Sequence, residues 1–176
     1  GHRIIWGGHP SITPLIYYVI ARTLENTIDL DLLSKDARKE KLLSVIKKEI
    51  SDHVTIYQSL FFKDKFPEDN DKFDNIVFTE NMGDKPSSIH LMRKQMLSEN
   101  DFAAAVFIGG MDGIEVEYNM FKELHPKALL LPIASTGAAT KIIFDSLSNE
   151  DEAKHESFLK DYGYMSLFQK YLIDKI

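Results

Sequence analysis

Three short segments of small residues follow apolar runs in this sequence, and each precedes a helical pattern. They are Gly7-Gly8, Gly109-Gly110 and Ser135-Thr136-Gly137. Glycine lets the backbone approach a ligand closely, and the free N–H groups at the start of a helix attract negative charge. A phosphate or pyrophosphate is therefore the class of ligand that these segments favour. The pattern is neither a Walker loop nor G-x-G-x-x-G, so the ordinary ATP and dinucleotide signatures do not apply.

Two charged residues flank the central segment. Arg93 precedes the apolar run 102–108, and Glu117 lies in the acid-rich helix predicted after Gly109-Gly110. By its spacing, Glu117 shares one face of that helix with Ile114, Tyr118 and Phe121. A carboxylate in an apolar stripe needs a partner, so we expect Glu117 to meet either Arg93 or a hydroxyl group of a ligand.

Strands and helices alternate along the chain. Short apolar runs predict strands at residues 3–6, 54–60, 76–79, 102–108 and 128–133. Helical patterns occupy residues 15–24, 34–50, 87–98, 135–147 and 164–173, with a connector at 25–33 and an acidic turn at 67–74. This order predicts an α/β fold: a doubly wound, mostly parallel, Rossmann-like sheet with helices on both faces, in a single domain. Ligands bind at the carboxyl ends of the strands in such sheets, so we expect the three segments to converge on one crevice.

Two of these elements carry a more specific expectation. The run 102–108 is apolar throughout, which is typical of a parallel strand that is buried on both faces. The helix 15–24 is apolar on nearly every side, so we expect it to be buried on two sides, in the core or against a second copy of the chain. Thr13 can cap this helix, and Pro14 suits its first position.

Composition excludes several classes of function. The 176 residues carry a net charge of −6, which argues against a nucleic-acid surface. The absence of cysteine excludes disulfides, thiolate zinc sites and cysteine nucleophiles, and the histidines have no metal-ligand spacing, so no metal is predicted. No apolar run reaches the roughly 20 residues of a membrane span, and no signal peptide is visible, so a cytoplasmic location is expected. The first predicted strand begins almost at the first residue, which suggests a domain taken from a longer protein.

The residues around the central segment resemble a known family. Arg93-Lys94, followed by a strand and Gly109-Gly110-Met111-Asp112-Gly113, is similar to the SLOG superfamily, which includes the Lonely-guy phosphoribohydrolases. In those enzymes an R-K pair precedes P-G-G-x-G-T-x-x-E, and the arginine and the last glutamate act on a nucleoside monophosphate. Gly7-Gly8-His9-Pro10 with Thr13-Pro14-Leu15 is closer to one branch, the sirtuin- and TIR-associated SLOG (STALD) domains of bacterial antiviral defence, as in Thoeris systems. The resemblance covers residues 4 to about 147.

This resemblance implies a bacterial sensor that binds an NAD-derived signal, a cyclic ADP-ribose isomer or a related nucleotide, and needs no cofactor. It also implies an effector of the TIR, sirtuin or another type outside this chain, and assembly into a homo-oligomer. Helix N-termini after Gly8, Gly110 and Thr136 would hold phosphates, Arg93 would add a fixed charge, and Glu117 would accept a ribose hydroxyl. The expected ligand-binding residues are Gly7, Gly8, His9, Pro10, Ser11, Thr13, Arg93, Gly109, Gly110, Met111, Asp112, Gly113, Glu117, Ser135, Thr136 and Gly137.

The sequence departs from the enzymes of the family at the reacting centre. Ile108 replaces the proline, Asp112-Gly113 replaces glycine-threonine, and the glutamate position falls on Val116 unless the loop is one residue longer, which gives Glu117. Binding without turnover is therefore the first hypothesis. A phosphoribohydrolase that cleaves nucleoside monophosphates with Arg93 and Glu117 is the second hypothesis, and a nucleotide-free interaction domain is the third.

Several of these residues also have purely structural interpretations. Asp112 and Glu115 have the spacing of a capping box. Arg93 can be an exposed helical residue and His9 a turn residue, and Ser135 and Thr136 can serve as helix caps as well as phosphate donors.

Overall fold

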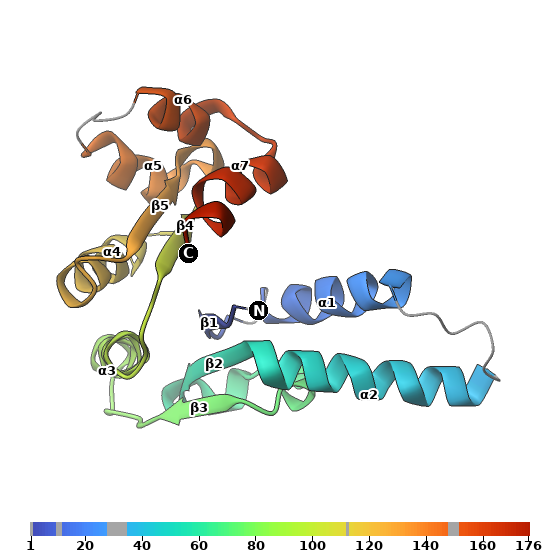
Figure 1. The fold of residues 1–176 in the computed structure, drawn as a ribbon. Helices are drawn as coiled ribbons and strands as arrows, with labels where there is room; N and C mark the ends of the chain where they lie inside the picture. Colours follow the sequence, from blue (N-terminus) through green and yellow to red (C-terminus); the bar gives the residue numbers. More distant parts are fainter. Residues whose placement is uncertain (1, 10–11, 28–34, 112, 148–151) are drawn as a thin grey trace. The chain divides into compact units, whose positions relative to one another are not determined.

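The computed structural model describes residues 2–9, 12–27, 35–111, 113–147 and 152–176. Strands and helices alternate along most of these residues (Figure 1). The chain divides into two compact units, Gly1–Met96 and Leu97–Ile176. The first unit holds a three-stranded sheet and the second a two-stranded sheet.

The sheet of the first unit is parallel throughout. Its order is β1-β2-β3, where β1 is Ile4–Gly7, β2 is Val54–Ser59 and β3 is Ile76–Thr79. Gly7 pairs with Tyr57, and Ser59 pairs with Thr79, so the carboxyl ends of the strands lie at one edge of the sheet. The helices of this unit are α1 (Thr13–Thr27), α2 (Lys35–His53) and α3 (Lys85–Ser98), with 3₁₀ segments η1 (Leu60–Lys65) and η2 (Glu68–Lys72).

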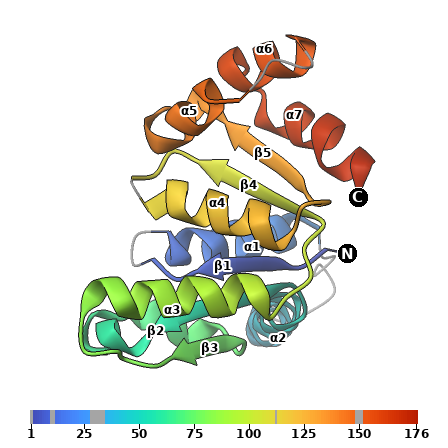
Figure 2. The same cartoon turned by 90° about the vertical axis from the view of Figure 1, so that its left-hand side faces the viewer.

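Helices cover both faces of this sheet. Trp6 and Ile56 are paired neighbours that face the core formed with α1 and α2. Gly7, one residue further, points to the opposite face, where a Cβ would lie 3.5 Å from the Cε of Met92 in α3. Figure 2 shows α3 and α1 on opposite sides of β1.

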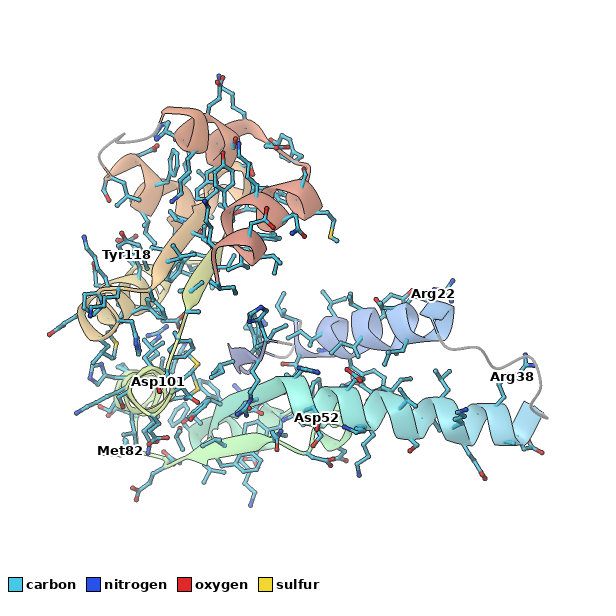
Figure 3. The ribbon with its side chains drawn as sticks, in the orientation of Figure 1. Arg22, Arg38, Asp52, Met82, Asp101 and Tyr118 are labelled. Atoms are coloured by element: carbon cyan, nitrogen blue, oxygen red, sulfur yellow. The ribbon has the colours of Figure 1, made fainter. Side chains whose placement is uncertain are left out.

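The second unit repeats this arrangement on a smaller scale. Its strands β4 (Ala104–Ile108) and β5 (Leu129–Ile133) pair in parallel. The helices α5 (Ala138–Asp145), α6 (Glu152–Lys160) and α7 (Tyr164–Tyr171) form a core with one face of β5. The helix α4 (Gly113–Leu124) packs on the other face of the sheet, where the rings of Phe107 and Tyr118 meet with centroids 5.3 Å apart. Tyr118 is labelled in Figure 3. The 3₁₀ segments are η3 (Ala134–Thr136) and η4 (Ile173–Lys175).

Each unit therefore has helices on both faces of a parallel sheet, and the predicted Rossmann-like α/β fold is confirmed. Every predicted strand is present, with bounds that differ by at most two residues. The expectation of a single domain stays a prediction. Among the helices of the described residues, none is long and apolar enough to span a membrane.

The predicted burial of β4 is wrong. In β4, Phe107 is buried, but Val106 and Ile108 are exposed, because these alternate residues face away from α4. In α1, Tyr17, Ile20 and their neighbours pack on the sheet, whereas the opposite face, with Leu15, Tyr18 and Val19, is exposed in the single chain. The expected burial of this face against a second copy of the chain stays a prediction. An apolar run alone does not say how many faces of an element are covered.

Some boundaries also differ from the prediction. The helix expected from residue 135 begins at Ala138, after the 3₁₀ turn η3, and the acidic turn 67–74 contains the 3₁₀ helix η2. The helix α6 was not predicted. Most of the predicted connector 25–33 lies outside the described residues, and its first three residues belong to α1.

Candidate functional site

The turn after β4 consists of two glycines in the left-handed region. Gly109 has φ of 56° and Gly110 has φ of 85°, conformations that residues with a side chain rarely adopt. A Cβ at Gly110 would lie 2.1 Å from the Cγ1 of Ile114, in the first turn of α4. The side chain of Ile114 therefore fills the space beside Gly110, and only glycine fits at position 110.

Two threonines hold this turn in place, and we call Thr136 and Thr140 the threonine clamp. The N–H of Gly109 donates to the Oγ1 of Thr136 at 2.8 Å, and that hydroxyl donates to the carbonyl of Ile133 at 2.5 Å. The carbonyl of Gly109 accepts the hydroxyl of Thr140 at 2.8 Å and its N–H at 3.0 Å. Both backbone groups of Gly109 are thus satisfied by the segment after β5. The only hydrogen of the Thr136 hydroxyl is used by Ile133, so this hydroxyl acts as a support for the turn.

The segment between η3 and α5 has an unusual backbone. Gly137 has φ of 72°, and Ala138 has φ of 54°, the one left-handed residue with a side chain in the described chain. The N–H of Ala139 donates to the carbonyl of Gly110 at 3.4 Å, which adds a further link between the two turns. Ser135 is half-buried, and its hydroxyl has no hydrogen-bond partner among the described residues.

The predicted apolar face of α4 is confirmed. Tyr118 and Phe121 are buried, and Ile114 and Glu117 on the same face are half-buried. Burial raises the pKa of the Tyr118 hydroxyl, because the charged form loses its solvation. Glu117 takes part in at least one non-covalent interaction within the structure.

The turn after β1 is held by the first residue of α1. Thr13 is fully buried, and its Oγ1 accepts the N–H of His9 at 3.2 Å, while its own N–H donates to the carbonyl of His9 at 3.0 Å. The N–H of Gly8 donates to the carbonyl of Tyr57 at 2.8 Å, which extends the pairing of β1 with β2 by one residue. A Cβ at Gly8 would lie 3.1 Å from the Cδ of Gln58.

Arg93 lies in α3, in the same unit as the Gly7-Gly8 turn. It is half-buried and takes part in an interaction within the structure, so the interpretation of Arg93 as an exposed helical residue is wrong. Lys94 beside it is exposed.

The comparisons with known proteins decide the family. The model of the SLOG cluster3 family matches residues 40–172, which is most of the chain. The chain belongs to the SLOG cluster3 family. The resemblance to the SLOG superfamily seen in the sequence is thereby confirmed. Neither the search of curated proteins nor that of solved structures finds a match.

The structure places the predicted residues of this SLOG chain in two groups. In the second unit it brings Gly109 and Gly110 together with Thr136 and Gly137, while Met111 is exposed and Gly113 is the first residue of α4. In the first unit it brings Gly8, His9 and Thr13 together. Pro10, Ser11 and Asp112 lie outside the described residues, so the proposed capping box with Asp112 is untested.

Three residues that support the turns of this SLOG fold were missed in the sequence. They are Thr140 of the clamp, Gln58 beside Gly8, and Asn70, whose Nδ2 donates to the Oε1 of Gln58 at 2.7 Å. A signal was present for Gln58, because a polar residue at the end of an apolar strand lies at the ligand edge of a parallel sheet. No group of three or more potential metal ligands occurs in the part of the chain that is described.

Proposed function

We propose that this SLOG chain is a sensor that binds an NAD-derived nucleotide of the cyclic ADP-ribose type and regulates an attached or associated effector. Membership in the SLOG cluster3 family supports a nucleotide-related function. The observation that carries the proposal is the Gly109-Gly110 turn, which the threonine clamp holds at the start of α4. A turn that is fixed before the ligand arrives loses little conformational entropy on binding.

The ligand's phosphate would bind at this turn. The helix α4 has 12 residues, so its first N–H groups and its dipole favour an anion there. Because Gly109 carries no side chain, and a Cβ there would meet only the carbonyl oxygen of Thr136 at 3.9 Å, a phosphate oxygen can approach the backbone at this residue. Glu117, on the same helix, would accept a ribose hydroxyl. The Gly7-Gly8 turn and Arg93, in the first unit, stay predicted ligand contacts.

The residues at the reacting centre favour the hypothesis that the nucleotide is bound but not hydrolysed. Ile108 stands where the enzymes of the superfamily carry proline, and the threonine hydroxyl of their motif is missing. The acid that remains, Glu117, is half-buried on the apolar face of α4. An acid in such a position is suited to a hydrogen bond with a ribose hydroxyl.

Calorimetry tests the proposal with cyclic ADP-ribose isomers, ADP-ribose, NAD and AMP. We expect at least one of them to bind, and we expect Gly110→Ala to lose that binding because of its contact with Ile114. Gly83→Ala is the matched control: Gly83 has φ of 88°, close to that of Gly110, but a Cβ there meets nothing within 4 Å. Failure of all four types of nucleotide to bind would contradict the proposal.

Regulation follows if the nucleotide binds one arrangement of subunits more tightly than another, since only differential affinity shifts an equilibrium. The exposed apolar face of α1, with Leu15, Tyr18 and Val19, supports a homo-oligomer. The effector, of the TIR, sirtuin or another type, and a role in bacterial antiviral defence belong to this proposal through the resemblance to the STALD branch.

A second candidate function is hydrolysis of a nucleoside monophosphate in the manner of the Lonely-guy enzymes. Glu117, on the helix that follows the glycine turn, favours it, because those enzymes act with a glutamate that follows their glycine motif. Long incubation with nucleoside monophosphates, followed by chromatography, separates the two functions. Free base and ribose phosphate that disappear in Glu117→Ala would favour the enzyme, and unchanged nucleotide would favour the sensor.

A further inference from the structure

A buried pair of amide side chains lies beneath the turn after β1. Gln58, at the end of β2, is 4% exposed, and Asn70, in η2, is 7% exposed. The Nδ2 of Asn70 donates to the Oε1 of Gln58 at 2.7 Å. This hydrogen bond joins η2 to the carboxyl end of the sheet, within the first unit.

Gln58 is in contact with Gly8. A Cβ at Gly8 would lie 3.1 Å from the Cδ and 3.3 Å from the Oε1 of Gln58, so the amide fills the space beside the glycine. The N–H of Gly8 also donates to the carbonyl of Tyr57, the residue before Gln58. The position of Gly8 therefore depends on both the backbone and the side chain at the end of β2.

The amides of Gln58 and Asn70 orient each other, because the Oε1 of Gln58 accepts from the Nδ2 of Asn70. The Oδ1 of Asn70 is buried and has no hydrogen-bond partner among the described residues, so the bond to Gln58 fixes the orientation of the Asn70 side chain. A buried amide that loses such a partner is left unsatisfied, which strongly favours the paired arrangement.

The segment that carries Asn70 also contacts α1. The ring of Phe73 meets that of Tyr17 edge to face, with centroids 6.4 Å apart, and the Nζ of Lys72 lies 4.5 Å from the Tyr17 centroid. The helix α1 begins at Thr13, which holds His9. Both sides of the Gly8–His9 turn are thus connected to η2, one through Gln58 and the other through α1.

We propose that Gln58 and Asn70 are positioning residues that fix the Gly8–His9 turn in the conformation that receives the nucleotide. This inference rests on the proposed function, since it assigns a role in ligand binding to that turn. The pair contacts the turn and acts on the ligand through it.

The test uses Gln58→Met and Asn70→Leu, which keep the side-chain volume and remove the amide. In each variant we expect the nucleotide affinity to fall about tenfold and hydrogen exchange at the amides of Gly8 and His9 to become faster. The double variant should be about as weak as the single ones, because all of them lose the same interaction. The exchanged pair, Gln58→Asn with Asn70→Gln, should recover part of the affinity.

Ile50→Val is the control, because Ile50 is fully buried in the apolar core of the same unit and carries no polar group. We expect it to lower stability while affinity and exchange at the turn stay as in the wild type. An equal loss of affinity in Ile50→Val would overturn the inference, since the loss would then follow from stability alone.

The exchange measurement separates the two proposals. Unchanged exchange at Gly8 and His9 in Gln58→Met overturns the positioning role, whether or not a nucleotide binds. If exchange becomes faster while the wild type binds none of the nucleotides, the proposed sensor function fails and the positioning of the turn stands.

Discussion

The hydroxyl oxygen of Thr136 accepts the backbone N–H of Gly109 at 2.8 Å, so a side chain that follows β5 fixes the turn that follows β4. The two strands are parallel neighbours, and their carboxyl ends therefore lie together. The residue at position 136 must accept from Gly109 and also donate to the carbonyl of Ile133. A hydroxyl can do both, whereas an apolar side chain of the same shape can do neither.

Thr136→Val tests the clamp with almost no change in shape. It leaves the N–H of Gly109 and the carbonyl of Ile133 without this partner, which we expect to cost about 1–3 kcal/mol of unfolding free energy. Because the turn is then less well fixed, we expect nucleotide affinity to fall about tenfold. Urea denaturation and calorimetry measure the two effects.

Ser166→Ala is the control. The hydroxyl of Ser166 donates to the carbonyl of Gly163 at 2.8 Å, but at an exposed position. Stability and affinity should both stay near the wild-type values, since water replaces an exposed partner. A loss of affinity in Ser166→Ala as large as that in Thr136→Val would show that the clamp has no special role.

The residues that hold the turns in place through hydrogen bonds could not be predicted from the sequence. The glycine turns and the strands before them were found because glycine and apolar runs are local signals. Thr140 and Asn70 act through hydrogen bonds to residues 31 and 12 positions away, and no local pattern distinguishes them from other polar residues. The same limit applies to Val106 and Ile108, whose exposure depends on which helices cover each face of β4.

The stability of α4 depends on an aromatic group. Phe121 is 2% exposed, and its ring lies 5.3 Å from that of Phe102 and 4.9 Å from that of His125, between centroids. We expect Phe121→Ala to lower the free energy of unfolding by about 3–5 kcal/mol, since it leaves a cavity in this group.

Val116→Ala is the comparison for this variant, because Val116 lies on the same helix but is 42% exposed. We expect its effect to be within about 0.5 kcal/mol, as is usual for a surface position. Denaturation followed by circular dichroism measures both variants. Similar effects of the two substitutions would mean that the aromatic group does not anchor α4.

The exposed face of α1 predicts an effect on assembly. If this face joins subunits, Val19→Glu places a charge in an apolar contact, and we expect the chain to dissociate. Sedimentation velocity measures the change. Lys39→Glu, at an exposed position of α2, also introduces a glutamate and should leave the oligomer intact. A wild-type chain that is monomeric at all concentrations would contradict this part of the proposal.

We expect Asp84 to account for part of the fall in unfolding free energy at low pH. Asp84 directly precedes α3, the helix that carries Arg93. The Oδ1 of Asp84 accepts the backbone N–H of Ser87 at 2.9 Å, and this bond, together with one from the Ser87 hydroxyl, lowers the pKa of the carboxyl. A lowered pKa means that the folded state favours the carboxylate. The resulting stabilisation is therefore complete above the pKa of the unfolded chain and is lost as the pH falls through the folded pKa.

Asp84→Asn keeps an oxygen that can accept from Ser87 but cannot titrate. We therefore expect its free energy of unfolding to fall less steeply than that of the wild type between neutral pH and about pH 3. Urea denaturation across this range measures the slopes, with Asp64→Asn, at an exposed position of η1, as the control that should follow the wild type. If Asp84→Asn and the wild type lose stability in parallel, the protonation of Asp84 does not contribute to the loss of stability in acid.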